Sequence, residues 1–190
     1  MTNSFLADQT FKNQIYTEKR LPKAAYENCV FEGCNFENGY VDNQNFMECQ
    51  FVDCNLSNAN LAHTILKEVR FSHCKMMGLN FEKCNDFLLD FSFHNCSLQH
   101  SSFYGLTLKN IAFIDCKLQE VDFTEADLTL ANFDSSDLER AIFYQTNLQK
   151  ANFTKAQNFN IDPEKNRLKN AKFSKESLLG LLRKYEIKIE

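Results

Sequence analysis

The stretch from Ile111 to Phe153 reads, in blocks of five, IAFID CKLQE VDFTE ADLTL ANFDS SDLER AIFYQ TNLQK ANF. The third residue of each block alternates between Phe and Leu without exception, beginning at Phe113. The first residue of each block is small or short, as at Cys116 and Ala126, and the remaining positions are mostly polar. Neither an amphipathic helix nor a simple strand produces an apolar period of five. The pattern therefore indicates a structural repeat.

A period of five has a direct geometric meaning. Side chains two residues apart in a strand share a face, so the first and third residues of each block point inward. The last two residues then turn a corner. If every corner is a right angle, four blocks close a square coil, and successive coils stack as a β-solenoid with a spacing of about 4.8 Å. The alternation places Phe on two opposite sides of the square and Leu on the other two. We therefore predict an all-β solenoid.

Blocks such as ADLTL, ANFDS and ANFTK resemble the pentapeptide-repeat proteins, and the C-terminal sequence is similar to the group that confers quinolone resistance or microcin B17 immunity. The resemblance covers about four fifths of the chain and implies a right-handed quadrilateral β-helix. It also implies that the protein mimics B-DNA in shape and charge. The partners implied in this way are the type II topoisomerases DNA gyrase and topoisomerase IV. The protein would protect them from quinolones or from a gyrase-poisoning toxin.

The repeat divides the chain into three parts. Residues 1–23 keep the period of five but carry polar residues at the small position, so we predict an N-terminal cap over the first coil. Residues 24–173 are expected to form the β-helix. A continuous Phe column requires a two-residue insertion, which we place within residues 84–87, with Leu88 as the next inward residue. Pro163 predicts a loop at residues 156–165.

The last part, residues 174–190, is predicted to begin with a helix capped by Ser174 and to end in a short strand. The resemblance implies that this segment joins two copies of the chain as a homodimer. The alternative is that its apolar residues cover only the last coil of their own chain. The apolar residues concerned are Leu178, Leu179, Leu181, Leu182, Tyr185, Ile187 and Ile189.

Eight cysteines raise the question of disulfides or a metal site. All of them occupy the small inward position of a block, where a cysteine packs as a small apolar side chain. Zinc would require thiolates or histidines that converge in tetrahedral geometry, and the four histidines fall on different outward positions. We therefore expect reduced core cysteines, no metal and no cofactor. They are Cys29, Cys34, Cys49, Cys54, Cys74, Cys84, Cys96 and Cys116.

Charge is distributed unevenly along a chain whose net charge is −4. Residues 115–139 carry eight carboxylates against the single cation of Lys117, a net −7, whereas residues 140–190 carry eleven Lys and Arg against five Asp and Glu. We call the eight carboxylates the acidic band and predict that it binds the partner. The alternative is a solvated surface that keeps the protein in solution. The band consists of Asp115, Glu120, Asp122, Glu125, Asp127, Asp134, Asp137 and Glu139.

The sequence contains no recognisable catalytic motif, and a filled β-helix offers no obvious pocket, so we do not expect an enzyme. Direct nucleic-acid binding is not expected, because the basic residues gather only toward the C-terminal end. No apolar run is long enough to span a membrane and the N-terminus does not read as a signal peptide, so we expect a cytoplasmic protein. Two function classes remain: a DNA mimic that binds a topoisomerase, and a structural module that binds a different partner.

Overall fold

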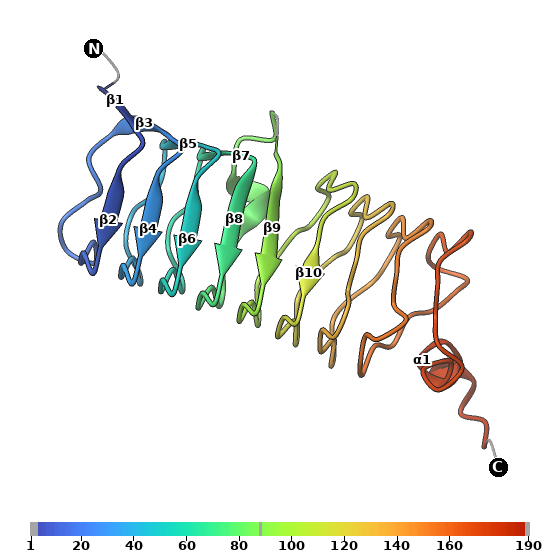
Figure 1. Ribbon diagram of the computed structural model, residues 1–190. Coiled ribbons are helices and arrows are strands. Elements are labelled where there is room, and N and C mark those ends of the chain that lie inside the picture. The colour runs from blue at the N-terminus through green and yellow to red at the C-terminus, as the bar shows by residue number, and fades with distance from the viewer. Residues whose placement is uncertain (1–3, 88, 189–190) are drawn as a thin grey trace.

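The computed structural model describes residues 4–87 and 89–188 and is a right-handed, four-sided β-helix (Figure 1). Successive coils stack side by side from the N-terminal end to the C-terminal end, where a short helix closes the rod. The predicted fold class is therefore confirmed. No helix among the described residues is long and apolar enough to cross a membrane.

Two parallel sheets form adjacent sides of the rod. The first sheet contains, in order, β1 (Ser4–Ala7), β3 (Ala24–Glu27), β5 (Asn45–Met47) and β7 (Ile65–Lys67). The second contains β2 (Thr10–Lys12), β4 (Val30–Glu32), β6 (Gln50–Val52), β8 (Val69–Ser72), β9 (Phe91–His94) and β10 (Phe113–Ile114). Short 3-10 helices lie at η1 (Phe81–Lys83) and η2 (Arg183–Tyr185), and the only α-helix of the described chain is α1 (Leu179–Leu182).

The corners have a repeating backbone conformation. Nearly every fifth residue of the rod has a positive φ, as at Asn110, Glu125 and Leu130. At many corners, a backbone N–H also closes the turn, as when Ala131 donates to the carbonyl oxygen of Leu128. The left-handed residue lets the chain turn the corner within two residues, which is why Asn, Asp and Gly are frequent there.

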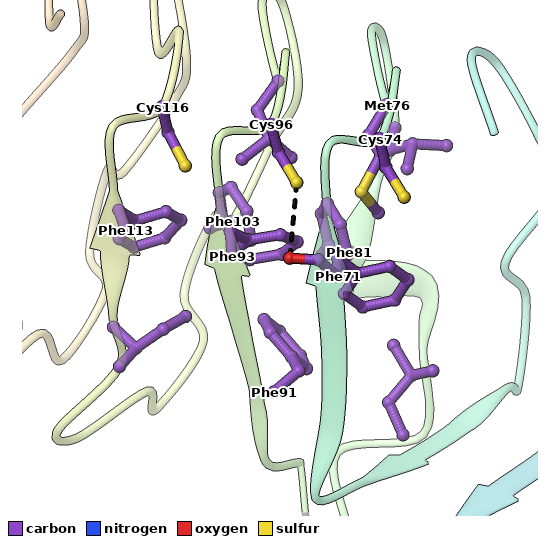
Figure 2. Packing of buried hydrophobic residues seen from close by; sticks show 14 of the residues in the cluster. Phe71, Cys74, Met76, Phe81, Phe91, Phe93, Cys96, Phe103, Phe113 and Cys116 are labelled. Carbon is purple, nitrogen blue, oxygen red and sulfur yellow. Dashed lines mark hydrogen bonds between the residues drawn. The ribbon is translucent and has the colours of Figure 1, made fainter. Parts of the chain in front are cut away.

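The core consists of columns of stacked side chains. One column of Phe rings runs through the whole rod, and neighbouring ring centroids lie 4.7 to 5.3 Å apart. A second Phe column lies on the opposite side in the C-terminal half, so that Phe113 meets Phe123 edge to face at 5.6 Å. Figure 2 shows part of this packing, with Phe71, Phe93 and Phe113 following one another along the rod. The alternation of Phe and Leu thus places Phe on opposite sides, as predicted.

The eight cysteines are all buried and free, which confirms their predicted inward position. Five of them form a column beside the Phe column. The thiols of four of these five donate to carbonyl oxygens of the preceding coil, as from Cys96 to Phe71 at 3.5 Å (Figure 2), whereas Cys116 donates to Ile114. Ser136 also donates to the preceding coil, to the carbonyl oxygen of Phe113 at 2.9 Å. Side chains at the small position therefore also donate hydrogen bonds to buried backbone carbonyl groups at the corners.

The position of the insertion overlaps the predicted one. β8 pairs with β9 at an offset that joins Phe71 to Phe93, two residues more than the offset of the other strand pairs. Asn85 still donates to Thr64 with the regular spacing, so the extra residues lie between Asn85 and Asp90. Leu88, the predicted next inward residue, lies outside the described residues.

The N-terminal prediction requires a correction. β1 and β2 pair in register with β3 and β4, and Tyr16 stacks on Phe36 with a centroid distance of 4.8 Å. Residues 4–16 are thus the first coil itself and not a separate cap. The polar residues at its small positions are tolerated because the end coil has a neighbour on only one side.

The C-terminal part also differs from the prediction, but only from the helix onward. Residues 156–165 interrupt the repeat, as the predicted loop does: Asn158 is exposed at the position where an inward residue is expected, and Phe159 and Ile161 are buried over the last coil instead. The α-helix itself begins at Leu179, later than predicted, although the Ser174 hydroxyl accepts the Ser177 N–H at 3.2 Å, as a capping residue does. Gly180 packs directly against the ring of Phe159, where a larger residue would not fit. No strand forms at Ile187, and Ile189 lies outside the described residues.

Candidate partner-binding surface

The four sides of the rod are named here by their inward residues in the acidic region. Side A holds Phe113 and Phe133, side B holds Leu118, side C holds Phe123, and side D holds Leu128. The carboxylates of the acidic band all lie outward, and none is buried. They are distributed around the whole rod. Five lie on the sides: Asp134 on side A, Asp137 and Glu139 on side B, Asp122 on side C and Asp127 on side D. The other three, Asp115, Glu120 and Glu125, lie at corners between sides.

Three carboxylates of the band are paired with cations from the same chain. Glu120 lies 2.6 Å from the Arg140 guanidinium and also 3.2 Å from the His100 imidazole. Asp127 lies 3.6 Å from Lys109, and Asp134 lies 3.4 Å from Lys155. These pairs reduce the negative field of the band. Within the described residues, no ion pair involves the remaining members, Asp115, Asp122, Glu125, Asp137 and Glu139.

Some of these carboxylates also support the corners. An oxygen of Asp122 accepts the backbone N–H of Thr124 at 2.8 Å, and Asp127 and Asp137 make the same contact two residues ahead. Asn132 occupies the equivalent position in a neighbouring block and accepts in the same way at 3.2 Å. An acceptor at this position supports the turn, and an amide supplies it as well as a carboxylate, so the negative charge is not needed for this contact.

The predicted dimerisation residues separate into two groups. Leu181 packs against the core and Leu182 is half-buried, so these two belong to the closure of the last coil. Four others, by contrast, are exposed by 43 to 55%: Leu178, Leu179, Tyr185 and Ile187.

An ion cluster fixes the end of this segment to the rod. Lys184 lies 2.6 Å from Asp162 and 2.8 Å from Glu164, and the Tyr185 hydroxyl donates to Glu164 at 3.0 Å. Lys184 holds the pKa of both carboxyls below their ordinary values. The exposed apolar side chains are therefore presented by an anchored segment.

A group of exposed apolar side chains on side C was not predicted from the sequence. Tyr104, Ile142 and Tyr144 occupy outward positions and are 44 to 49% exposed. Tyr40, on the same side near the N-terminal end, is 45% exposed. The signal is present in the sequence: apolar residues recur at the outward positions of the blocks that form side C.

Shallow grooves run along two corners. One, of about 650 Å³, follows the corner between sides C and D and is lined in part by Glu125, Asp127, Lys165 and Arg167. The other, of about 470 Å³, lies beside the insertion. Both are open to solvent. Among residues 4–87 and 89–188, no group of three or more His, Cys, Asp or Glu side chains is placed to hold a metal ion.

Comparison with known proteins gives consistent results. The family model described as "Pentapeptide repeat region" matches residues 19–85 and 44–123, and the model "Pentapeptide repeats (8 copies)" matches residues 108–143 and 126–157. None of the curated proteins matches the sequence.

Solved structures share the fold. A trypsin-treated variant of QnrB1, a plasmid-mediated fluoroquinolone resistance protein, is 15% identical with a TM-score of 0.64, and the match covers 99% of this chain and 98% of that one. HetL from the cyanobacterium Nostoc sp. strain PCC 7120, a pentapeptide repeat protein involved in heterocyst differentiation regulation, is 18% identical. Its TM-score is 0.69, and the match covers 87% of this chain and 84% of HetL. At these identities the likeness concerns the fold.

Proposed function

This chain belongs to the pentapeptide-repeat family, and we propose that it is a DNA mimic that binds a type II topoisomerase, either DNA gyrase or topoisomerase IV. Bound at the surface that normally holds DNA, it would protect the enzyme from quinolones or from a gyrase-poisoning toxin. In this proposal the protein acts by binding and not as an enzyme.

The observation that carries the proposal is the placement of the acidic band. At its turn-supporting positions an uncharged acceptor makes the same hydrogen bond, yet the chain has Asp122, Asp127 and Asp137 where other blocks have Asn, as at Asn132. A charge that stability does not require is available for recognition. The DNA-binding surface of a topoisomerase is positively charged, because it must neutralise phosphates. Carboxylates on a rod are complementary to such a surface.

The dimensions of the rod set a limit on the mimicry. The continuous Phe column makes eight steps from Phe11 to Phe173. At about 4.8 Å for each step, the column is about 38 Å long. Duplex DNA of that length carries about 22 charges. Since the acidic band supplies eight carboxylates, three of them paired, the proposed mimicry depends on shape as well as on charge.

Variants of QnrB1 share their fold with this protein over nearly the full length of both chains. This similarity is consistent with the proposal, since QnrB1 is a fluoroquinolone resistance protein. HetL has the same fold and takes part in a different process, so the fold alone does not select the partner. The second candidate is therefore an interaction module for another protein. The exposed aromatic group on side C favours protein binding in either case, because Tyr is enriched at protein interfaces.

We also propose that two copies associate through residues 174–188 with their rods end to end. The exposed apolar side chains of this segment, held in place by the Lys184 cluster, support the homodimer. Such a dimer would double the length of the rod available to a two-fold symmetric enzyme.

A supercoiling assay tests the proposed function. Purified gyrase or topoisomerase IV is inhibited with ciprofloxacin and the protein is added in increasing amounts, with a parallel series without the drug. Recovery of activity in the presence of the drug, or inhibition in its absence, is the expected result. If neither enzyme responds at protein concentrations well above that of the enzyme, the second candidate replaces the first.

A further inference from the structure

Side C presents aromatic and aliphatic side chains to solvent. Between residues 90 and 173, four large apolar side chains are exposed, and three of them lie on this side: Tyr104, Ile142 and Tyr144. The fourth, Leu130, lies at the corner between sides D and A. Clustering on one side of a regular rod distinguishes this group from isolated exposed apolar residues, which are normal on any surface.

Two tyrosines of side C already hold a cation from the same chain. The guanidinium carbon of Arg20 lies 4.0 Å from the ring centroid of Tyr40, and the same arginine reaches Asp42 at 3.8 Å. Farther along the rod, the Lys165 ammonium lies 5.8 Å from the ring centroid of Tyr144. The arrangement of a ring and a carboxylate around a cation is therefore present within this protein itself.

Tyr104 has the ring and the carboxylates but lacks the cation. Gly105 donates to the carbonyl oxygen of Thr124, so Thr124 lies one coil beyond Tyr104, with Asp122 and Glu125 on either side of it. The Glu125 carboxylate near the phenol is the main reason that the pKa of Tyr104 is raised. In the described part of the chain, no Lys or Arg lies over the Tyr104 ring, and neither carboxylate is in an ion pair.

We infer that Tyr104, Asp122 and Glu125 form a docking site for an arginine side chain of a basic protein partner. Arginine fits better than lysine, because a planar guanidinium can stack on the ring while it donates to carboxylates. Ile142 and Tyr144, on the coil two steps beyond Tyr104, extend the contact by about 10 Å along the rod. These exposed side chains would form the centre of the interface, and the carboxylates would form its polar rim.

The inference rests on the proposed function in taking the partner to be a basic protein surface, and it adds which side of the rod faces that partner. The groove at the corner between sides C and D begins at Glu125 and ends at Lys165 and Arg167, beside Glu164, whose carboxylate is already paired with Lys184. A basic partner segment is therefore attracted to the end near Tyr104 and repelled from the other end. A nucleic acid is excluded as the occupant, because its phosphates would lie against two carboxylates.

The variants follow from the geometry. Tyr104→Ser removes the ring, and Tyr104→Phe keeps it. Asp122→Asn combined with Glu125→Gln removes both charges, and Asn retains the acceptor for the Thr124 N–H. The matched control, Asp53→Asn with Glu48→Gln, removes the same charge from two exposed positions in the N-terminal half of the rod, outside the acidic band. Melting temperatures of all variants establish that each one is folded.

Two probes are used with the full chain: a nona-arginine peptide, observed by NMR, and purified DNA gyrase, observed by biolayer interferometry. The peptide should shift backbone amides around Tyr104, Glu125 and Ile142 most. Tyr104→Ser and the side C double variant should each weaken binding about tenfold, equivalent to about 1.4 kcal/mol. Tyr104→Phe and the matched control should remain within about twofold of the parent protein.

The outcomes separate this inference from the proposed function. Side C amide shifts with the peptide, together with no gyrase binding by the parent protein, would contradict only the proposed function. The inference is overturned if the peptide does not bind, or if it shifts amides around Asp115, Asp134 and Glu139 as strongly as those around Tyr104. It is also overturned if the matched control loses as much gyrase binding as the side C double variant.

Discussion

Removing charge from the acidic band without changing its shape should weaken partner binding and leave the fold intact. The change is a quadruple substitution to the uncharged amides: Asp122→Asn, Glu125→Gln, Asp127→Asn and Asp137→Asn. Asn at three of these positions preserves the acceptor that supports the corner, as Asn132 does in the parent protein. The side chains remain polar and nearly identical in volume.

The expected effect on stability is small and follows from the two interactions that these substitutions weaken. Asp127 no longer forms its ion pair with Lys109, which joins side chains that are 26% and 57% exposed. A pair of this kind contributes at most about 1 kcal/mol. Asp137 accepts from Gln119 and from Asn158, and its replacement by Asn removes one of these two hydrogen bonds, about 0.5–1.5 kcal/mol. The total is at most about 2.5 kcal/mol, which corresponds to a fall in melting temperature of roughly 5–10 °C.

The expected effect on binding is larger. Four fewer charges facing a basic surface should raise Kd at least about tenfold, or about 1.4 kcal/mol, and most of the change should appear in the association rate. The dependence of Kd on salt should also become weaker. Biolayer interferometry with purified gyrase or topoisomerase IV at several salt concentrations measures both quantities, and the supercoiling assay with ciprofloxacin measures protection.

A matched control removes four exposed carboxylates from the N-terminal half of the rod and should bind within about twofold of the parent protein. The control positions are Glu37, Glu48, Asp53 and Glu68. Equal losses in both quadruple variants would show that only the net charge matters. Unchanged binding in the first variant would refute the role of the acidic band and leave it as a solvated surface.

Three further predictions concern the fold and the assembly. Phe113→Ala should reduce the free energy of unfolding by about 3–5 kcal/mol, because the ring is fully buried between two stacked rings, and a loss below about 1 kcal/mol in denaturant titrations would contradict this packing. Leu179→Lys with Ile187→Lys should convert a dimer into a folded monomer in light scattering, and an unchanged mass would rule out this interface. The cysteines should react with a thiol reagent slowly in the native protein and rapidly after unfolding, because they are buried and burial raises the pKa of Cys49 to about 11; rapid native labelling of several thiols would contradict it.

The sequence was sufficient to predict the architecture because the repeat is local and regular. The alternation from Phe113 to Phe153 fixes which side chains point inward, and a spacing of four blocks fixes which of them stack. The same regularity predicted the buried cysteines and the total size of the insertion. Each of these conclusions needs only the period of five and the tendency of apolar side chains to leave water.

Predictions were less accurate where the repeat ends, since a terminal coil has a neighbour on one side only. The periodicity of residues 4–16 was visible, but only pairing with the next coil shows that they form a coil rather than a cap. At the other end, the short helix is placed by the contact between Gly180 and Phe159 and by the Lys184 ion cluster. These contacts join residues about 20 positions apart and have no signature in the local sequence.

For the candidate site, the sequence by itself determined that carboxylates concentrate in residues 115–139 and that they face outward. Only the tertiary structure decided how they are distributed and paired. Coil stacking brings Arg140 to Glu120 and Lys155 to Asp134, which reduces the charge on part of the band. It also brings Asp122 and Glu125 next to Tyr104, a residue that composition alone gives no reason to select. The repeat specifies whether a side chain points inward or outward. The charged side chains that surround it come from other coils, and the strength of their interaction depends on distances that only the folded chain defines.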